Sequence, residues 1–284
     1  MSLNEVDGLG LQITILGSNA AVAAHGRFPS GQLLKGGNDI CLIDCGEGTQ
    51  FRLQQYKLPS GRIRYIFISH LHGDHIFGLP SLITTWHLTG RVLPLDIWSP
   101  PGLEELMSGI FRFTGCTPAF PIRYHAIPEG SSDELLESTT LRVRAFPLKH
   151  RLPTSGFRFF LLNKEVPLSG QRNVTNFNKH SQLGCSYAYC SDTSYNPEVV
   201  AYLKDVDLLY HEATFLEEQS DKASKTGHST AREAASIAAL VHAKGLVLGH
   251  FSARYKDLGL FLNEASTVFN PCFLAKEGVT FHVT

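Results

Sequence analysis

The stretch that decides the fold reads His70-Leu71-His72-Gly73-Asp74-His75 and directly follows the apolar run Tyr65-Ile66-Phe67-Ile68-Ser69. Three imidazoles held this close repel one another once they are protonated, and a bound metal ion removes that conflict. Period-two alternation would project His70, His72 and Asp74 to one side and His75 to the other. Gly73 can adopt backbone angles that other residues avoid, so the segment can also curl and offer two coordination directions. The segment therefore predicts two adjacent metal sites.

The size and charge of the chain set the first limits. Its 284 residues can bury a large core, and we expect a single domain over 1–284. The formal net charge of −1 excludes the global positive field of a protein that coats nucleic acid. The six cysteines form no C-x-x-C pair, which predicts reduced, mostly buried thiols. The chain shows neither a targeting segment nor an apolar run of about 18 residues, so we expect a cytoplasmic protein without a membrane partner.

Apolar runs bounded by glycine and polar residues alternate with segments of helical period. Because strand-rich halves carry helices between their strands, we expect two β-sheets packed face to face under layers of helices. The expected strands are 11–16, 40–43, 64–69, 95–98, 122–127, 141–146, 156–162, 186–190, 207–211 and 246–250, and the expected helices are 47–56, 79–88, 103–113, 197–203 and 230–242.

A binuclear metal site needs more ligands than one segment supplies. His150, Asp192 and His250 each come just after an apolar strand, where loops gather at one edge of a sheet. Taken singly, each residue could equally be a helix cap or a surface residue. Their recurrence at strand ends favours a role as the remaining ligands.

The pattern of residues 70–75 followed by His150, Asp192 and His250 resembles that of the metallo-β-lactamase fold. That resemblance implies an α/β protein, an αββα sandwich of two mixed β-sheets flanked by helices. Further motifs make the chain resemble the ribonuclease Z family, whose members remove 3′ trailers from precursor tRNA. The motifs that carry this resemblance are Asp44-Cys45-Gly46-Glu47-Gly48-Thr49-Gln50, residues 69–80, His211-Glu212-Ala213-Thr214-Phe215, His228-Ser229-Thr230 and His250-Phe251-Ser252-Ala253-Arg254-Tyr255.

The resemblance implies two Zn²⁺ ions per chain, although Mn²⁺ or Fe accept similar histidine and carboxylate ligands. Each ion would have three ligands of its own, and one aspartate would lie between the two ions. The implied ligands are His70, His72 and His150 for one ion, Asp74, His75 and His250 for the other, and Asp192 as the bridge.

The resemblance also implies catalytic residues. Phosphodiester cleavage expels an alkoxide that benefits from a proton, and Glu212 could hold His228 in its charged, donating state. Asp74 would orient the attacking water or accept its proton. Asp44 is either a carboxylate that orients a ligand imidazole or a turn-forming residue before glycine. Arg254 is either a phosphate contact or part of a structural salt bridge.

The implied activity is that of an endoribonuclease that removes 3′ trailers from precursor tRNA by binuclear-metal phosphodiester hydrolysis and leaves a 3′-hydroxyl. Its partners would be precursor tRNA and a second copy of the chain in a homodimer. The alternative is a small-molecule phosphodiesterase of the same fold. A third class, a non-catalytic RNA-binding or scaffold protein, fits poorly with an intact set of ligands.

The segment 163–184 is the only long stretch without a clear period. Members of the family carry a tRNA-clamping arm between the third histidine ligand and the bridging aspartate, so the resemblance makes this segment a shortened arm. A plain surface loop is the other reading. No Gly-Pro dipeptide, which many bacterial arms contain, occurs in the chain. The charged residues from 151 to 184 leave a local excess of positive charge that could meet an RNA backbone; they are Arg151, Arg158, Lys164, Glu165, Arg172 and Lys179.

Overall fold

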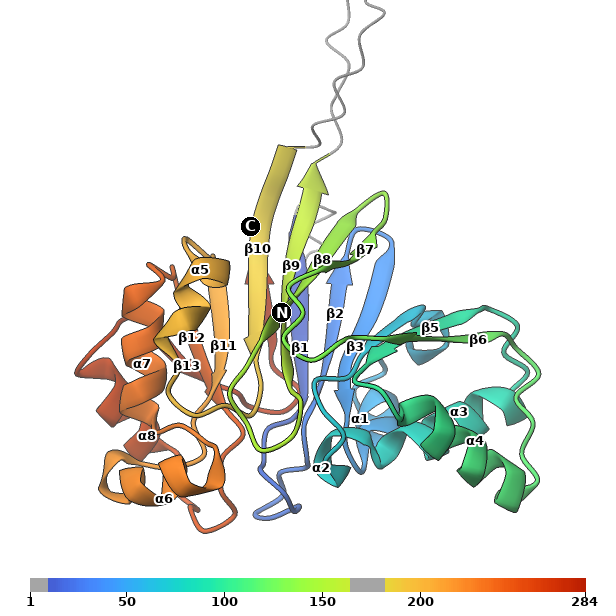
Figure 1. Ribbon diagram of the computed structural model, residues 1–284, viewed down its shortest axis with the longest axis horizontal. Helices are drawn as coiled ribbons and strands as arrows, with labels where there is room; N and C mark the ends of the chain where they lie inside the picture. The colour runs from blue at the N-terminus through green and yellow to red at the C-terminus, as the bar shows by residue number, and fades with distance from the viewer. Residues whose placement is uncertain (1–9, 164–181) are drawn as a thin grey trace, which may run out of the picture.

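A computed structural model describes residues 10–163 and 182–284 of the chain. Within these ranges, two mixed β-sheets pack face to face and helices cover their outer sides (Figure 1). The αββα sandwich expected from the sequence is confirmed. The expected arm-like insertion at 163–184 falls almost wholly outside the described residues.

The first sheet runs from antiparallel to parallel across its width. Strands β14, β1, β2 and β3 pair antiparallel, whereas β3, β4, β5 and β6 pair parallel. Both β3 and β4 are buried along their full length, as expected for strands covered on both faces. In spatial order the strands are β14 (Thr280–Val283), β1 (Leu11–Gly17), β2 (Gly31–Gly36), β3 (Asp39–Cys45), β4 (Tyr65–Phe67), β5 (Leu95–Ser99) and β6 (Ile122–Ala126).

The second sheet repeats this plan. Strands β7, β8, β9 and β10 pair antiparallel, and β10, β11, β12 and β13 pair parallel. In spatial order the strands are β13 (Cys272–Leu274), β12 (Leu246–Gly249), β11 (Leu208–Glu212), β10 (Gln182–Cys190), β9 (Ser155–Asn163), β8 (Leu141–Pro147) and β7 (Glu134–Glu137).

Helices join the parallel strands, because a parallel connection must cross from one end of the sheet to the other. Those between β3 and β6 lie against the first sheet, and those after β10 lie against the second (Figure 1). None of the helices within the described ranges has the length and apolar character that a membrane crossing requires. They are α1 (Thr49–Gln55), α2 (Gly73–Ile76), α3 (Gly78–Leu88), α4 (Leu103–Thr114), α5 (Val200–Leu203), α6 (Ser220–Thr226), α7 (Ala231–Leu240) and α8 (Gly259–Ser266), with the 3₁₀ turns η1 (Ser60–Arg62), η2 (Pro197–Val199) and η3 (Glu217–Gln219).

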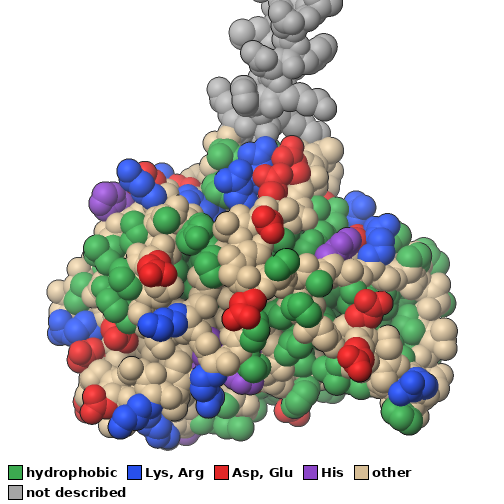
Figure 2. Space-filling model, viewed as in Figure 1, with side chains coloured by type: hydrophobic (Ala, Val, Ile, Leu, Met, Phe, Trp, Pro, Cys, Tyr) green, Lys and Arg blue, Asp and Glu red, His purple; other side chains and the backbone are tan. Residues whose placement is uncertain are grey.

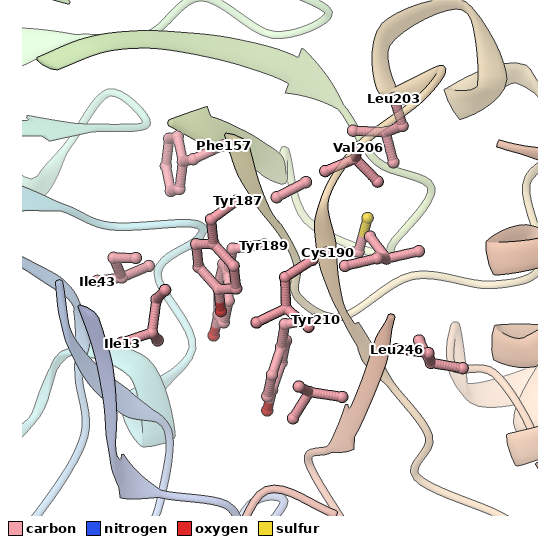
Figure 3. Close-up of a cluster of buried hydrophobic side chains, with 14 of the residues drawn as sticks. Ile13, Ile43, Phe157, Tyr187, Tyr189, Cys190, Leu203, Val206, Tyr210 and Leu246 are labelled. Atoms are coloured by element: carbon pink, nitrogen blue, oxygen red, sulfur yellow. The ribbon is translucent and has the colours of Figure 1, made fainter. Parts of the chain in front are cut away.

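The main core lies between the two sheets. Ile13 and Ile43 of the first sheet and Phe157 and Tyr187 of the second belong to one buried cluster (Figure 3). Each fully buried side chain of this kind contributes about 1.5–3 kcal/mol through the hydrophobic effect. A second buried cluster fills the space between the first sheet and helices α1, α3 and α4. The two clusters fix the sheets relative to each other and thereby fix the edge at which their strands end.

Charges of both signs are visible on the surface, and the cysteines are unpaired. On the face shown in Figure 2, the visible Lys and Arg side chains of the described part are interspersed with Asp and Glu. All six cysteines are free thiols. Three of them are buried and three are half-buried, so the expectation of mostly buried thiols holds only in half of the cases.

The expected alternation through residues 70–75 is wrong. Strand β4 already ends at Phe67, and α2 begins at Gly73 with the backbone N–H of Phe77 donating to Gly73 at 2.8 Å. The helical turn directs Asp74 away from the side shared by His70 and His72. The φ of Gly73 is not positive, so glycine is favoured at this position by close packing and not by backbone conformation. A Cβ built on it would lie 2.2 Å from the ring of Phe77.

Candidate metal centre

The predicted ligands come together at one edge of the sandwich. The segment 70–75 follows β4, and Asp44 lies within β3 near its carboxyl end. Loops after the strands of the second sheet supply the others. His150 follows β8, Asp192 follows β10, and His250 follows β12. Open α/β sheets place their sites beyond the carboxyl ends of parallel strands, and β4, β10 and β12 obey that rule.

One group of ligand atoms is formed by His70, His72 and His150 with Asp192, all within 4.8 Å of one another. His72 Nδ1 lies 2.9 Å from His70 Nε2 and 3.3 Å from His150 Nε2. Asp192 Oδ2 lies 3.6 Å from His70 Nε2 and 3.8 Å from His150 Nε2. Three ring nitrogens and one carboxylate oxygen thus face a common point.

A second group is formed by Asp74, His75 and His250. Asp74 Oδ2 lies 3.5 Å from His75 Nε2 and 3.4 Å from His250 Nε2. The other oxygen of Asp192, Oδ1, lies 3.3 Å from His75 Nε2 and 3.2 Å from His250 Nε2. Asp192 therefore presents one oxygen to each group. The structure brings all seven predicted ligands together in the two sets that the resemblance implied.

Hydrogen bonds behind the rings fix which nitrogen faces the centre. His150 Nδ1 donates to the carbonyl of Gly227 at 2.7 Å, and His75 Nδ1 donates to Asp44 at 2.8 Å. Each ring therefore directs Nε2 toward the centre. When the ring is neutral, this nitrogen carries a lone pair that can bind a metal ion. His75 Nε2 is buried and has no hydrogen-bond partner among the described residues. A bound cation would satisfy this atom, so the donor set fits a divalent metal ion.

The ionisation of three ligand histidines also suits metal binding. Burial holds the pKa of His70 well below its usual value and lowers the pKa of His72 and His150. Rings that are neutral near pH 7 keep the lone pair that a metal ion needs.

Unlike these three rings, His75 and Asp192 are both stabilised in their charged forms. Burial disfavours a charged His75, yet Asp192, Asp44 and Asp74 outweigh it and raise the pKa of that ring well above its usual value. Burial alone would raise the pKa of Asp192, but His250 and other nearby rings hold it well below its usual value. The buried carboxylates thus favour positive charge at the centre, and a metal ion supplies it.

Asp44 is fully buried and orients two of the predicted ligands. Its Oδ2 accepts from His75 Nδ1 and from the hydroxyl of Ser69 at 2.9 Å. That hydroxyl lies 3.1 Å from His70 Nδ1 and can accept its proton, so Asp44 also orients His70. Tyr189 donates to the same oxygen at 2.7 Å. Asp44 therefore has the geometry of a ligand-orienting carboxylate, one of the two readings of the sequence.

Glu212 is a second carboxylate that orients side chains, on the other side of the centre. Its Oε1 accepts from His228 Nδ1 at 2.8 Å, and its Oε2 accepts from the hydroxyl of Thr214 at 2.6 Å. The hydroxyl of Thr214 lies 3.0 Å from His250 Nδ1 and can accept its proton. The backbone N–H of Thr193 adds a further bond to Glu212 at 3.0 Å. One buried carboxylate thus orients a ligand histidine and His228 together.

The local sequence fixes the position of His228. Thr230 caps α7, and Glu233 completes the capping box by accepting from the Thr230 backbone N–H at 2.8 Å. The hydroxyl of Ser229 donates to the carbonyl of Thr193 at 2.7 Å. Burial disfavours a charged His228, but Glu212 outweighs it and raises the pKa of His228 to about 9. The ring is therefore charged at neutral pH and can donate a proton.

Two residues of the centre have a strained backbone. Asp44 has φ 54° and His250 has φ 59°, the left-handed region that residues other than glycine rarely adopt. Such conformations cost on the order of 1–3 kcal/mol and persist where the surrounding structure fixes them, often at functional sites. Here, the strain turns both side chains back toward the centre at the point where a strand ends.

An open cleft of about 370 Å³ leads to the centre. Its volume falls within the range of about 300–1,000 Å³ that is common for ligand sites. Four residues of the centre line it, together with Phe77 and Arg151; the four are His72, Asp74, Asp192 and His228. The centre is therefore accessible to a substrate.

The arginines that the sequence suggested as phosphate contacts, Arg254 and Arg158, contact parts of the protein instead. The guanidinium of Arg254 lies 5.5 Å from the ring centroid of Phe215, and no salt bridge of Arg254 occurs among the described residues. Arg158 donates to the carbonyl of Tyr202 at 2.9 Å and to that of Lys204 at 3.1 Å. Arg158 is thus a structural residue, and its expected part in a basic arm is corrected. Three cations of that arm lie outside the described residues: Lys164, Arg172 and Lys179.

Sequence reasoning named Asp44 and Glu212 but missed the hydroxyl groups that bond to them. Ser69 and Thr214 lie inside motifs that were recognised, and Tyr189 lies three residues before Asp192. The bonds of Ser69 and Tyr189 to Asp44, and the contact of Thr214 with His250, join distant parts of the chain, so only the folded structure reveals them. The signal available in the sequence was their position next to a ligand.

The fold and the centre define a class of protein. Residues 40–251 match the Beta-lactamase superfamily domain, and the chain is a metallo-hydrolase of that superfamily. It is 38% identical over 296 residues to a ribonuclease Z from Bacteroides fragilis, covering 94% of this chain and 97% of that protein. It is 39% identical over 308 residues to a ribonuclease Z from Cytophaga hutchinsonii, covering 97% of both.

A solved structure gives the same result. The short form of human tRNase Z superposes with a TM-score of 0.77 and 32% sequence identity, covering 96% of this chain and 99% of the human chain. The chain belongs to the ribonuclease Z family.

Proposed function

We propose that the two groups of the centre each hold one divalent metal ion, zinc being favoured by histidine and carboxylate ligands, and that the chain uses them to remove 3′ trailers from precursor tRNA. As a member of the ribonuclease Z family, the chain is a metal-dependent, tRNA 3′-processing endoribonuclease. The observation that carries the two-ion proposal is the orientation of Asp192. Its Oδ2 lies toward His70 and His150, and its Oδ1 lies toward His75 and His250. One carboxylate shared in this way suits two adjacent ions.

When bound, the metal ions would stabilise the charge of the phosphoryl oxygens and make water a better nucleophile near neutral pH. The residues of the chain supply position and protons. Asp74 lines the cleft, and its Oδ2 is held by the backbone N–H of Ala21 at 2.8 Å. The carboxylate is therefore fixed at the cleft, where it can orient the attacking water and accept its proton.

His228 is the proposed proton donor. Its Nδ1 is bonded to Glu212, and no described residue bonds to its Nε2. The ring lines the cleft, so Nε2 can reach a substrate. In the proposed reaction, water forms a new bond to phosphorus while the bond between phosphorus and the 3′ oxygen breaks. His228 protonates that oxygen, which leaves a tRNA 3′-hydroxyl and a trailer with a 5′-phosphate.

A small-molecule phosphodiesterase is the alternative that the comparisons do not favour, because the relatives of similar length are ribonucleases. We further propose that the protein works in the cytoplasm as a homodimer and folds as a single domain over 1–284. Sedimentation analysis of the purified chain tests the dimer directly.

A paired assay tests the proposed function. Purified protein is incubated with a 3′-extended tRNA transcript and, separately, with bis(p-nitrophenyl) phosphate. We expect trailer removal by the wild type and its loss in His72→Ala, which removes a ligand. The matched control is His242→Asn, which removes a surface imidazole that pairs with Asp205 outside the site and keeps a residue that tolerates the local φ of 53°. Turnover of the small ester without trailer removal would support the alternative, and binding of tRNA without turnover would support a scaffold.

A further inference from the structure

Phe77 is an exposed aromatic residue at the cleft. It lies between α2 and α3, and its side chain lines the cleft together with His72 and Asp74. The residue is 67% exposed, whereas its neighbours Ile76 and Gly78 are buried. Its exposure at the edge of the cleft leaves the ring free to contact a ligand.

The backbone on both sides of Phe77 is rigid. The ring packs against Gly73, where an added Cβ would lie 2.2 Å from a ring carbon. An added Cβ on Gly78 would lie 2.1 Å from the carbonyl oxygen of Gly46. The two close approaches pack the backbone that carries Phe77 tightly against the metal-binding segment. The backbone position of Phe77 at the edge of the cleft is therefore set by the fold.

Arg151 brings a positive charge to the same cleft. It follows the ligand His150, whose bond to Gly227 fixes the start of the loop. Arg151 is exposed, and its guanidinium makes no hydrogen bond or ion pair with any described residue. Arg91 and Arg158, in contrast, are bonded to backbone carbonyls. Arg151 is thus a cation without a structural partner at the entrance to a phosphodiesterase centre.

An aromatic ring and a guanidinium at one cleft match the two parts of an unpaired nucleotide. Nucleobases stack on exposed aromatic rings, and guanidinium groups bind phosphate oxygens. We propose that Phe77 and Arg151 form a nucleotide subsite, in which Phe77 stacks on the base next to the scissile phosphate and Arg151 contacts the neighbouring phosphate. The inference rests on the proposed function and names how the same cleft holds single-stranded RNA.

Kinetics with two substrates test the stacking contact. In Phe77→Ala, we expect kcat/KM for 3′-extended tRNA to fall about 5- to 150-fold, the loss of one base stack, mainly through KM. The kcat for bis(p-nitrophenyl) phosphate is measured in parallel, because at saturation it reports on the metal centre and not on base stacking. A loss in that kcat as large as the loss on tRNA would overturn the stacking contact. Phe77→Trp should restore tRNA cleavage. The matched control is Phe113→Ala, which removes another exposed ring, on α4.

A fluorescent base gives a readout that does not depend on turnover. Non-cleavable 3′-extended tRNAs carry 2-aminopurine on either side of the scissile linkage, and stacking on a ring quenches its emission. We expect quenching of one of the two probes on binding to the wild type and to Phe77→Trp, but not to Phe77→Ala. Equal quenching by the wild type and Phe77→Ala would overturn the stacking contact.

The salt dependence of RNA binding tests Arg151. Loss of one phosphate contact should reduce the slope of log K against log salt by about 0.7 in Arg151→Gln. The control is Arg62→Gln, which removes an exposed charge from η1, before the start of β4 and at the opposite end of that strand from the centre. An unchanged slope in Arg151→Gln would overturn the phosphate contact. If the wild type failed to cleave the transcript at all, the proposed function itself would fail, which is a separate outcome.

Discussion

The hydroxyl of Thr214 donates to Glu212 Oε2 at 2.6 Å. The same hydroxyl lies 3.0 Å from Nδ1 of the ligand His250, and Glu212 also accepts from His228. One side-chain oxygen thus links a metal ligand to the carboxylate that holds the proposed proton donor. Hydrogen bonds of this kind set the tautomer and orientation of a ligand imidazole and raise its basicity.

Removing the hydroxyl of Thr214 should weaken metal binding. In Thr214→Val, His250 Nδ1 loses its acceptor while the side-chain volume is kept, so we expect metal affinity to fall about 10- to 100-fold. Competition with a chelator, followed by metal analysis, measures the change. Thr214→Ser retains the hydroxyl and should stay near the wild type. Equal metal affinity in the valine and serine variants would show that the link to Glu212 has no effect on His250.

Neutralising Asp44 should have a similar effect on the other side of the centre. Asn tolerates the left-handed backbone that Asp44 adopts at φ 54°, so Asp44→Asn separates charge from backbone strain. We expect metal affinity to fall about 10- to 100-fold with the circular dichroism spectrum unchanged. Asp44→Ala adds backbone strain and should also lower the unfolding temperature. Retention of full metal affinity in Asp44→Asn would contradict the orienting role.

The need for His228 should depend on the leaving group. An alkoxide leaving from tRNA needs a proton, whereas p-nitrophenolate is a stable anion and does not. We therefore expect His228→Ala to lower kcat on 3′-extended tRNA about 10²- to 10⁴-fold and to change kcat on bis(p-nitrophenyl) phosphate far less. Parallel steady-state measurements on the two substrates provide the comparison. An equal loss on both would mean that His228 serves the centre as a whole.

Metal removal should destabilise the folded chain. The carboxylates of Asp44, Asp74 and Asp192 favour a cation, and a ligand that binds only the folded state adds to its stability. Dialysis against a chelator should therefore lower the unfolding temperature, and added Zn²⁺ should restore it. His72→Ala should show a smaller shift than the wild type, since it lacks a predicted ligand. His242→Asn should shift as much as the wild type does.

Arg91 should be important for stability and not for the centre. The residue is 8% exposed, and its guanidinium donates to the carbonyls of Ile63 at 2.6 Å and Leu93 at 2.9 Å, among others. Arg91→Met leaves these buried acceptors without donors and should cost about 2–4 kcal/mol of unfolding free energy, measured in urea. Arg123→Ala, which breaks an exposed ion pair with Asp96, should cause no comparable loss. Metal content should be unchanged in both variants.

The two-sheet architecture and the candidate ligands could be predicted from the sequence, because each candidate ligand lies beside a buried apolar strand. His150 and His250 are examples, each following a strand that hydrophobic periodicity identifies. Strands β2, β7, β13 and β14 were not predicted, since their strand character depends on pairing with neighbours.

Details of the centre that depend on three dimensions could not be predicted. The alternation expected after β4 failed because α2 starts at Gly73, whose backbone packs closely against the Phe77 ring. The hydrogen bonds from Ser69 to Asp44 and from His250 to Thr214 connect residues 25 and 36 positions apart. Spacing along the chain contains no signal for contacts of that kind.

The ligands are distributed from His70 to His250, and β14, which ends at Val283, pairs with the first strand of the chain. A polypeptide still being made on the ribosome therefore carries only part of the predicted centre until residue 250 has been added. A nascent chain shorter than 250 residues has no His250 with which to complete the second group of predicted ligands. We therefore expect nascent chains that stop before His250 to be inert toward the RNA around them.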